Sequence, residues 1–412
     1  MRILNITSVY PPASVGGAEL GAHNIAQEWL NQGHEVHTLA LCAPAAPENC
    51  DSHAGSEIDG VAVRRIPLQN IYWPFDAASK ANHPLARLGW HAIDTHNPFM
   101  ARRVLRHARE IQPEVVFTRN LQGFSTAVLP ALHALGVPLI HVLHDMSLIC
   151  VRTALYKNNA ACGEQQRRCL DCRALTLPRR RHLYPVQATI SPSRFIADVH
   201  QRHGLFTNIP AHVIPHALRR DVEPRIAAPD RAADEPLRFG VLGRVHPAKG
   251  VETILKAAAQ LSANKTPFSV TIAGTGEPEY LRTLQNCALS EVRFVGPQNT
   301  QAYLRNIDVL LFTPESTESF GNVVIEAFSQ GVPVISSDCG GPTELICGGS
   351  NGLVVPRADA SALADAMQRL ISSPSLQHRL ARTALQSASQ YTPARTADAY
   401  LNVVRSLTGA TP

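Results

Sequence analysis

The sequence predicts an α/β protein built from two doubly wound domains. Short apolar runs typical of buried strands alternate with helical patterns along the chain, and a length of 412 residues suits two domains. Strands that alternate with helices favour parallel sheets joined by right-handed crossovers. The predicted strands cover residues 2–9, 36–41, 61–66, 115–118 and 139–143 in the first half, and residues 237–242, 268–273, 292–295, 309–313, 334–336 and 352–355 in the second.

Helix ends and loop signals divide the chain between these strands. Gly33 marks the end of the helix that precedes the second strand. Residues 221–236 are rich in Pro, Ala and Asp, which is typical of a loop, and the join between the domains lies just before them. Residues 392–407 have an amphipathic helical pattern. We therefore expect a first domain over residues 1–212, a second over 213–390, and a C-terminal helix within 391–412.

Composition narrows the class of protein. The chain is 45% hydrophobic and 17% charged, a globular balance that argues against disorder. No apolar run approaches the roughly 18 residues of a membrane helix, and residues 1–6 are typical of a first strand rather than a secretory signal. An odd number of cysteines, nine, agrees with a reducing compartment, so we expect a cytoplasmic protein. The net charge of +5 is modest and no basic–aromatic platform is present, which disfavours nucleic-acid binding.

Two glutamates mark the most informative segment. Glu318 lies in a Gly-containing turn after the predicted strand 309–313, and Glu326 follows eight residues later in the helix that begins at Asn322. The backbone amides at that helix N-terminus present a positive dipole end to a ligand. This spacing suits one carboxylate on a polyhydroxylated ring and a second on other hydroxyls of the same ligand.

Cations and glycines at strand ends indicate a diphosphate site. Arg244 follows the strand 237–242, and Lys249 stands just before the helix 251–261. Together they can neutralise a leaving phosphate, although either one alone is explained by a surface turn. Gly16 and Gly17 follow the first strand, where glycines let the backbone approach a phosphate closely. A Gly-Gly turn is by itself weak support for this interpretation.

Together these residues resemble the family 4 retaining glycosyltransferases, which have the GT-B fold of the glycogen-synthase-like superfamily. The resemblance covers essentially the whole chain and is strongest over residues 237–356. The motifs that carry it are Gly16-Gly17-Ala18-Glu19, Gly33-His34-Glu35-Val36, His144-Asp145, Ser191-Pro192-Ser193, Val213-Ile214-Pro215, Gly243-Arg244 with Lys249-Gly250, Phe294-Val295-Gly296, Glu318-Ser319-Phe320-Gly321 with Glu326-Ala327, and Gly340-Gly341-Pro342-Thr343-Glu344-Leu345.

The resemblance implies a nucleotide-diphosphate sugar as donor, held mainly by the second of two domains that face a central cleft. It implies that Glu318 contacts the donor sugar, that Arg244 and Lys249 stabilise the departing diphosphate, and that His144 lies at the reaction centre. These roles require neither a metal nor a cofactor, and in this fold the C-terminal helix crosses back to the first domain. The donor-binding residues it implies are Gly16, Gly17, Val295 near the base, Ser319, Phe320, Gly321 and Asn322 near the sugar and phosphates, and Glu326 on the ribose.

Three positions depart from the family pattern. Residues 146–152 keep a cysteine and an arginine but lack the usual aromatic residues and proline, so the acceptor side differs there. His216-Ala217 stands where Asn-Gly is usual, and we expect this to affect a turn more than the chemistry. Arg119 stands where histidine is frequent.

A cysteine cluster leaves two interpretations open. Cys169 and Cys172 have the two-residue spacing of half a zinc site, and Cys150 and Cys162 could complete it. The gaps between them match no standard zinc finger, so reduced cysteines in a loop are the alternative.

Basic and aromatic groups in the first half suggest surfaces for an acceptor. One basic group lies on a helix that starts near Phe99, and its arginines are either solvated or dock on anionic lipid, where lipid-linked acceptors reside. The aromatic residues of the loop 69–98 either stack on an acceptor or pack in the core. The residues are Arg102, Arg103, Arg106 and Arg109 on the helix, Arg167, Arg168, Arg173 and Arg179-Arg180-Arg181 in a second basic patch, and Tyr72, Trp73, Phe75 and Trp90 in the loop.

We therefore predict a metal-independent glycosyltransferase that acts on a hydroxyl of a glycan or lipid-linked acceptor in polysaccharide or lipopolysaccharide biosynthesis. The biological setting rests on family analogy alone, and retention is implied by the resemblance. Both glutamates lie on one turn–helix unit, not on opposite sides of a bond as in a glycosidase. We therefore expect front-side displacement, in which the donor phosphate takes the acceptor proton. The alternatives are an epimerase or phosphorylase on the same fold, and a non-catalytic nucleotide-sugar-binding subunit.

Overall fold

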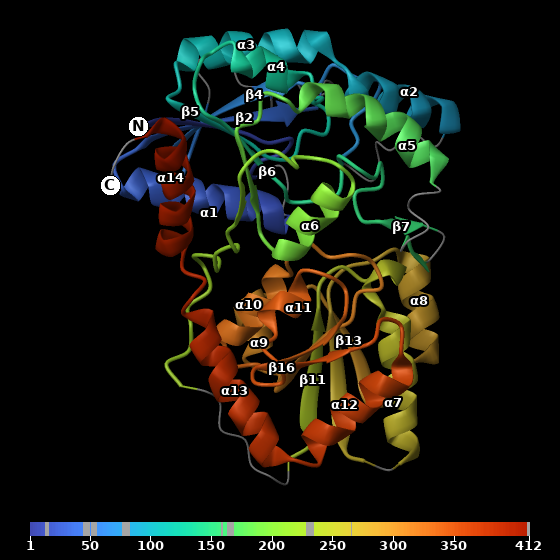
Figure 1. Cartoon of the computed structure of the whole chain (residues 1–412). Helices are drawn as coiled ribbons and strands as arrows, with labels where there is room; N and C mark the ends of the chain where they lie inside the picture. The colour runs from blue at the N-terminus through green and yellow to red at the C-terminus, as the bar shows by residue number, and fades with distance from the viewer. Residues whose placement is uncertain are drawn as a thin grey trace. The chain divides into compact units, whose positions relative to one another are not determined.

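The computed structural model describes residues 1–12, 16–43, 50, 56–75, 83–157, 160–162, 169–227, 235–264 and 266–409. The chain forms two compact units (Figure 1). Unit 1 comprises Met1–Ala154, Glu164–Ala217 and Pro393–Pro412, and unit 2 comprises Leu155–Gly163 and Leu218–Thr392. The chain thus passes from unit 1 to unit 2 after Ala217, five residues beyond the expected domain start at residue 213. The segment Leu155–Gly163, which the sequence placed in the first domain, belongs to unit 2.

Unit 1 is built on an eight-stranded sheet with the order β10-β9-β6-β5-β1-β2-β4-β3. Its strands pair in parallel except for the antiparallel edge pair β3–β4. Strand order reverses direction between β1 and β5, which makes the carboxyl ends of these strands the expected place for a ligand. The strands are β1 (Arg2–Ile6), β2 (Glu35–Cys42), β3 (Ser56–Ile58), β4 (Val61–Pro67), β5 (Val115–Thr118), β6 (Leu139–Val142), β9 (Ala188–Ser191) and β10 (Ala211–Val213).

The C-terminal helix returns to unit 1, as predicted. In Figure 1, α14 (red) lies beside α1 (blue). Trp29 of α1 donates its indole N–H to the carbonyl of Ala397 in α14 at 3.3 Å, and its ring stacks on Phe117 and meets Tyr400 edge-on. The helices of unit 1 are α1 (Gly17–Asn31), α2 (Pro84–Thr95), α3 (Pro98–Ile111), α4 (Val128–His133), α5 (Leu170–Thr176), the 3₁₀ helix η3 (Leu177–His182), α6 (Arg194–Arg202) and α14 (Pro393–Thr408).

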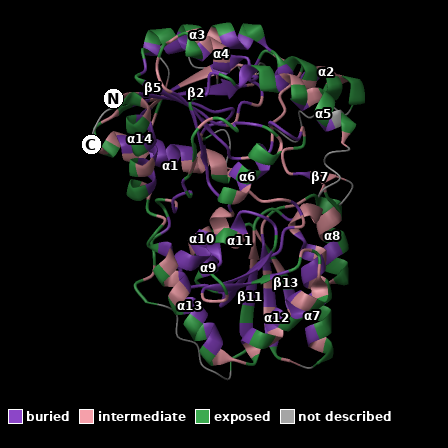
Figure 2. Cartoon of the chain, viewed as in Figure 1, coloured by how far each residue is buried: buried purple, intermediate pink, exposed green. Residues whose placement is uncertain are grey.

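Unit 2 has a six-stranded, all-parallel sheet with the order β13-β12-β11-β14-β15-β16. This is the doubly wound arrangement in which order reverses between the first and fourth strands, β11 and β14. The buried, β-branched-rich strands appear as the purple centre of the unit in Figure 2. Its elements are β11 (Leu237–Leu242), η4 (Pro247–Lys249), α7 (Val251–Ala263), β12 (Phe268–Ala273), α8 (Pro278–Cys287), β13 (Val292–Gly296), α9 (Thr300–Leu304), β14 (Val309–Phe312), α10 (Asn322–Ser329), β15 (Val334–Ser337), α11 (Pro342–Leu345), β16 (Gly352–Val355), α12 (Ala360–Ile371) and α13 (Pro374–Ala388), with the hairpin β7 (Tyr156–Lys157) and β8 (Ala160–Ala161).

The segment 69–98 is partly helical, because α2 lies within it. Trp90 of α2 is buried and donates its indole N–H to the carbonyl of Tyr72 at 2.9 Å, so this ring packs in the core. Trp73 and Phe75 are half-buried and pack edge-on against each other.

Two cysteines form a bond that the sequence did not predict. Cys42, at the end of β2, is joined by a disulfide to Cys50. In the described part of the chain, no helix is long and apolar enough to cross a membrane.

Candidate active site

Two of the predicted catalytic residues meet at the switch point of unit 2. Lys249 ends η4 after β11, and Glu318 lies in the loop after β14. The Lys249 Nζ donates to Glu318 Oε1 at 2.5 Å. Glu318 is fixed on both sides of its peptide, because its N–H donates to the Cys339 carbonyl at 2.8 Å and its carbonyl accepts from Gly341 N–H at 3.0 Å. The pair is partly exposed, so both side chains are accessible to a ligand.

Glycines allow the loops around this pair to pack closely. Gly250 has φ of +70°, and a Cβ at this position would lie 2.1 Å from the carbonyl oxygen of Thr313. Gly274 has φ of +147°, and a Cβ there would lie 1.7 Å from the carbonyl oxygen of Gly243. Only glycine permits both the backbone angle and the contact. The loops after β11, β12 and β14 therefore converge at the strand ends.

Arg244 follows Gly243 in the first of these loops. Its side chain is exposed, and among the described residues it has no ion-pair partner. A guanidinium at this place can therefore reach an anionic ligand without first breaking a salt bridge.

The predicted turn at residues 319–322 leads into α10. Gly321 has φ of +86° and a Cβ there would approach Pro342 Cγ to 3.1 Å, which explains why glycine precedes the helix. Phe320 is buried, and its ring meets Tyr391 edge-on. Phe320 therefore belongs to the core through its side chain, and only its backbone is available beside Ser319 and Asn322.

Glu326 is buried about one turn into α10, with only 6% of its surface exposed. Burial raises its pKa to about 7, while the nearby Arg219 opposes this shift and Asp221 adds to it. Arg219 is itself paired with Asp221, so the neighbouring cation is partly neutralised. Val295, at the end of β13, is 38% exposed, and its carbonyl accepts from Gln298 at 2.8 Å.

In unit 1, Gly16 and Gly17 form the N-terminus of α1, as expected from the sequence. Gly16 is the N-cap, and a Cβ there would lie 2.1 Å from Oε2 of Glu19, so the Glu19 side chain folds back over the first turn. Burial raises the pKa of the Glu19 carboxyl, and Asp145 adds to that shift. Glu19 belongs to the motif Gly16-Gly17-Ala18-Glu19. The motif does not predict that its side chain folds back toward the helix N-terminus.

His144 lies just after β6 and is buried between two basic residues. Its Nε2 is 3.0 Å from Arg119 Nη1 and its Nδ1 is 3.1 Å from His216 Nε2. A guanidinium can only donate, so His144 Nε2 accepts and Nδ1 carries the proton that is donated to His216. Burial holds the pKa of His144 well below its usual range, and the nearby His216 and Arg119 lower it further. The imidazole is therefore neutral.

Arg119 itself is 2% exposed and lies over the Tyr400 ring at 5.5 Å. Among the described residues its Nε and Nη2 have no hydrogen-bond partner. Arg119 and His216 are two of the three departures from the family pattern, and both touch His144. The structure thus shows that these departures form one cluster, where the sequence had suggested only a local change of turn at His216.

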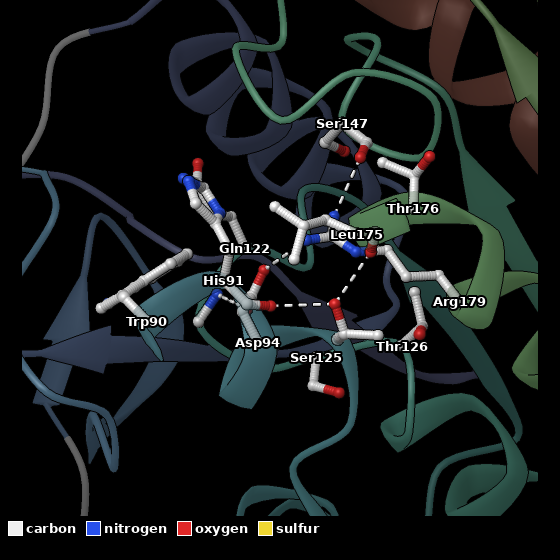
Figure 3. Close-up of polar contacts among 12 residues, drawn as sticks. Trp90, His91, Asp94, Gln122, Ser125, Thr126, Ser147, Leu175, Thr176 and Arg179 are labelled. Atoms are coloured by element: carbon white, nitrogen blue, oxygen red, sulfur yellow. Dashed lines mark hydrogen bonds and ion pairs between the residues drawn. The ribbon is translucent and has the colours of Figure 1, made fainter. Parts of the chain in front are cut away.

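A buried ion pair holds the loop that follows His144. Figure 3 shows Arg179 of η3 between Asp94 of α2 and the carbonyl of Ser147. Its Nη2 is 3.1 Å from Asp94 Oδ2 and its Nη1 donates to Ser147 at 2.9 Å, while Gly123 N–H donates to Asp94 Oδ1 at 2.6 Å. Burial raises the pKa of Asp94 and Arg179 opposes this. Arg179, which the sequence placed in a basic patch, is therefore a buried structural residue.

The cysteine cluster is divided between the units. Cys150 and Cys172 approach to 3.9 Å between their Sγ atoms in unit 1, whereas Cys162 belongs to unit 2. In the described ranges no group of three or more His, Cys, Asp or Glu side chains is placed to hold a metal ion. Arg167 and Arg168 of the predicted basic patch lie outside the described residues.

The geometry of unit 2 suits an anionic, polyhydroxylated ligand. A lysine and an exposed arginine lie at the strand ends, the N-terminus of α10 lies beside them, and a buried carboxyl stands deeper in the same helix. Fixed cations and backbone amides stabilise a diphosphate, while carboxylates accept hydrogen bonds from hydroxyls.

Comparison with known families agrees with this chemistry. The sequence pattern described as "Glycosyltransferase Family 4" matches residues 15–222, and the pattern described as "Glycosyl transferases group 1" matches residues 223–387. The two matches follow one another along the chain, and their boundary lies close to the passage from unit 1 to unit 2.

Individual proteins are similar over different shares of the chain. An uncharacterized 42.6 kDa protein in the cps region of Klebsiella pneumoniae is 26% identical over 345 residues, covering 84% of this chain and 87% of that protein. The lipopolysaccharide core biosynthesis glycosyltransferase LpsE of Rhizobium meliloti is 32% identical over 194 residues, covering 44% of this chain and 55% of that protein. Among solved structures, Anabaena HepE in complex with UDP aligns with a TM-score of 0.68 at 18% identity, covering 99% of this chain and 100% of that one.

Proposed function

This chain belongs to the family 4 glycosyltransferases and has their GT-B fold, and we propose that it is a retaining, metal-independent enzyme. It transfers a sugar from a nucleotide-diphosphate donor to a hydroxyl of a glycan or lipid-linked acceptor, and it needs no cofactor. The similar protein from a cps region and the similar lipopolysaccharide core enzyme support a role in polysaccharide or lipopolysaccharide biosynthesis. We place this reaction in the cytoplasm.

The contact between Lys249 and Glu318 carries the proposal. It brings a cation and a carboxylate to the switch point of unit 2 from two different loops. A partly exposed ion pair contributes little to folding stability, so stability alone does not explain its position. A donor would separate them: Lys249 turns to the diphosphate, and Glu318 accepts from the sugar hydroxyls. Arg244 adds a second positive charge, and Glu326 accepts from the ribose.

The proposed reaction is a front-side displacement. The bond between the anomeric carbon and the donor phosphate oxygen breaks, and the bond to the acceptor oxygen forms on the same face of the sugar. The acceptor proton passes to the departing phosphate oxygen, so no protein base is needed. The diphosphate leaves with the negative charge that Arg244 and Lys249 stabilise. A neutral His144 contributes no positive charge to the reaction, and a hydrogen bond from its ring to the sugar requires release of Arg119 or His216, which occupy its two ring nitrogens.

The first experiment is a thermal-shift screen of UDP-, GDP-, ADP- and dTDP-sugars without added metal. A donor present at about 100 times its Kd should stabilise the fold by about 2.7 kcal/mol. UDP-sugars are the first to test, because HepE was solved with UDP. We expect one donor class to stabilise the wild type and Glu279→Gln, a variant at an exposed glutamate of unit 2, and to stabilise Glu326→Gln clearly less at the same donor concentration.

Turnover then separates transfer from the alternatives. With the selected donor and an acceptor, Lys249→Met should lower kcat on the order of 10²-fold, as loss of one charge-stabilising group does in other enzymes. Donor stabilisation without any nucleotide release in the presence of acceptor would instead support the non-catalytic subunit. Nucleotide release that is independent of acceptor would support an epimerase or hydrolytic side reaction. Nuclear magnetic resonance of the product linkage tests retention.

A further inference from the structure

The outer face of α2 in unit 1 is apolar. Leu85 and Leu88, one helical turn apart, are 71% and 53% exposed, whereas Trp90 and Asp94 on the opposite side are buried. A Cβ on Gly89 would lie 2.9 Å from Cδ1 of Ile71, so Ile71, itself 52% exposed, lies against the same helix. An ordinary surface helix has this pattern reversed, with its leucines inward.

The neighbouring helix α5 has the same unusual exposure. Leu170, Arg173, Ala174 and Leu177 are spaced i, i+3, i+4 and i+7, so they share one face, and all four are exposed. Leu170 is 75% exposed. The two helices are in contact, and Thr95 at the end of α2 donates its hydroxyl proton to the Leu175 carbonyl at 2.9 Å. The exposed leucines therefore lie on two helices that are in contact, and exposed apolar surface of this kind marks an interaction site.

A cavity of about 460 Å³ lies on α3, lined by Arg102, Arg106 and Arg109 together with Leu105 and Glu110. A second cavity, of about 290 Å³, opens beside α5. Three guanidinium groups line the second one, Arg173 from α5, Arg180 from η3 and Arg202 from α6, together with His203 and the apolar Leu177 and Ile149. None of its described lining residues is a carboxylate.

Neighbouring arginines in the run 179–181 have different surroundings. Arg179 is buried against Asp94 (Figure 3), Arg180 lines the second cavity, and exposed Arg181 donates its Nε–H to the Pro178 carbonyl at 3.0 Å. Arg173 and Leu177 belong both to the exposed face of α5 and to the wall of this cavity. The exposed face of α5 is therefore continuous with the cationic cavity, and α2 lies beside it.

We propose that this surface docks on an anionic phospholipid bilayer. The leucines of α2 and α5 enter the interfacial layer, and a lipid phosphate occupies the cavity between Arg173, Arg180 and Arg202. Guanidinium groups form paired hydrogen bonds with phosphate oxygens, and arginines near an anionic leaflet add attraction to the apolar burial. A second copy of the chain fits less well, because a symmetric contact would place arginines against arginines.

Docking of this surface on a bilayer does not depend on the reaction proposed above. It does have a consequence for that reaction, because the inner side of α2 is tied to the loop after His144. Asp94 holds Arg179, and Arg179 holds the Ser147 carbonyl (Figure 3). A bilayer bound at the outer face of α2 would thus be linked through one buried ion pair to the acceptor-side loop.

Sedimentation of the full chain with lipid vesicles tests the proposal without any donor. Vesicles with about 30% phosphatidylglycerol should bind the protein and pure phosphatidylcholine vesicles should not, and binding should weaken as NaCl rises from about 0.05 to 0.5 M. Leu85→Ser/Leu88→Ser and, separately, Arg180→Gln/Arg202→Gln should each weaken binding by about tenfold or more. Arg181→Gln and Val354→Ser, an exposed apolar residue of unit 2, should bind within about twofold of the wild type. Unchanged melting temperatures confirm that the variants are folded.

Other results would overturn the proposal. Vesicle binding that is absent, or that survives both double substitutions, excludes this surface as the docking site. Light scattering that shows a dimer which dissociates in Leu85→Ser/Leu88→Ser identifies a second copy as the occupant. Titration with inorganic phosphate that matches vesicle binding in affinity, depends on Arg180 and Arg202 and ignores the leucines identifies a free phosphate compound as the ligand. If the wild-type chain binds vesicles as expected but has no transferase activity, that result would count against the proposed function and not against this docking surface.

Discussion

Donor binding should change the protonation state of Glu326. Its ordinary pKa near 4.5 is raised by burial to about 7, so about half of the molecules carry a neutral Glu326 at pH 7. A carboxylate that accepts hydrogen bonds from ribose hydroxyls is favoured in its charged form. Donor binding should therefore release about half a proton at pH 7. Isothermal titration calorimetry in two buffers of different ionisation enthalpy measures this release.

The control for that measurement is Glu326→Gln. The variant has no titrating group at this position, so its binding enthalpy should be the same in both buffers once corrected for dilution. Equal enthalpies in the wild type would contradict the role given to Glu326. The same titration of the wild type at pH 5, where Glu326 is protonated before binding, should show a larger release of protons if the carboxylate is the bound form.

At the level of loops and helices, Gly250 sets the position of Lys249. Alanine there meets the Thr313 carbonyl at 2.1 Å in addition to the strain of φ near +70°. Gly349 has a similar φ of +79° but open space around its Cβ position. We expect Gly349→Ala to cost about 1 kcal/mol of unfolding free energy, and Gly250→Ala to cost on the order of 3 kcal/mol because the β11 and β14 loops must separate. Urea unfolding measures both values.

The close contact also predicts a functional difference between these two alanine variants. Gly250→Ala moves Lys249 away from Glu318, so kcat should fall in this variant and stay near the wild-type value in Gly349→Ala. Equal destabilisation of the two variants would show that the loops relax around the added methyl group and do not position the lysine.

The elements that the sequence predicted well are those with strong local signals. The strand expected at residues 237–242 is β11 with the same bounds, because its apolar run is interrupted only by Arg238 and is typical of a strand in a parallel sheet. The helix expected from Asn322 is α10, which follows a glycine with positive φ. By contrast, the sequence indicates a loop over residues 69–98, where the structure has α2, since the leucines of this helix point outward and its inner face carries Trp90 and Asp94. A pattern with the apolar residues outside does not indicate a core-packed helix.

The sequence did not predict contacts between residues that are far apart in the chain. Asp94 and Arg179 are 85 positions apart, and a charge run such as residues 179–181 is ordinarily solvated. Nothing local indicates that its first arginine is buried. The candidate catalytic pair was identified because Lys249 and Glu318 each follow a strand at the switch point, where topology brings distant loops together. The cluster of Arg119, His144 and His216 was seen only as separate departures, because the fold and not the spacing joins them.

For the whole molecule, the two units should respond to pH in opposite directions. Unit 1 contains several histidines that burial keeps neutral, among them His141, whose pKa is lowered to about 3, and His200. A histidine with a lowered pKa binds a proton in the unfolded chain first, so its contribution to stability is lost as pH falls below about 6.5. These histidines outnumber the two carboxyls of unit 1 whose pKa is raised, Glu19 and Asp94. Unit 1 should therefore gain stability as pH rises.

Unit 2 has the reverse dependence because of Glu326. A carboxyl with a raised pKa holds its proton longer in the folded state, so stability falls as pH rises from about 4.5 to about 7. Between pH 5 and pH 7 the loss of stability from Glu326 and the gain from His141 are each about 2 kcal/mol.

Hydrogen–deuterium exchange of the full chain, corrected for the intrinsic rate at each pH, reports the two units separately. Amides in β6 and β9 should become more protected at pH 7 and those in α10 and β14 less protected. Glu326→Gln should remove the change in unit 2 and leave unit 1 as it was. Protection that moves in the same direction in both units would mean that Glu326 is not desolvated in the free protein.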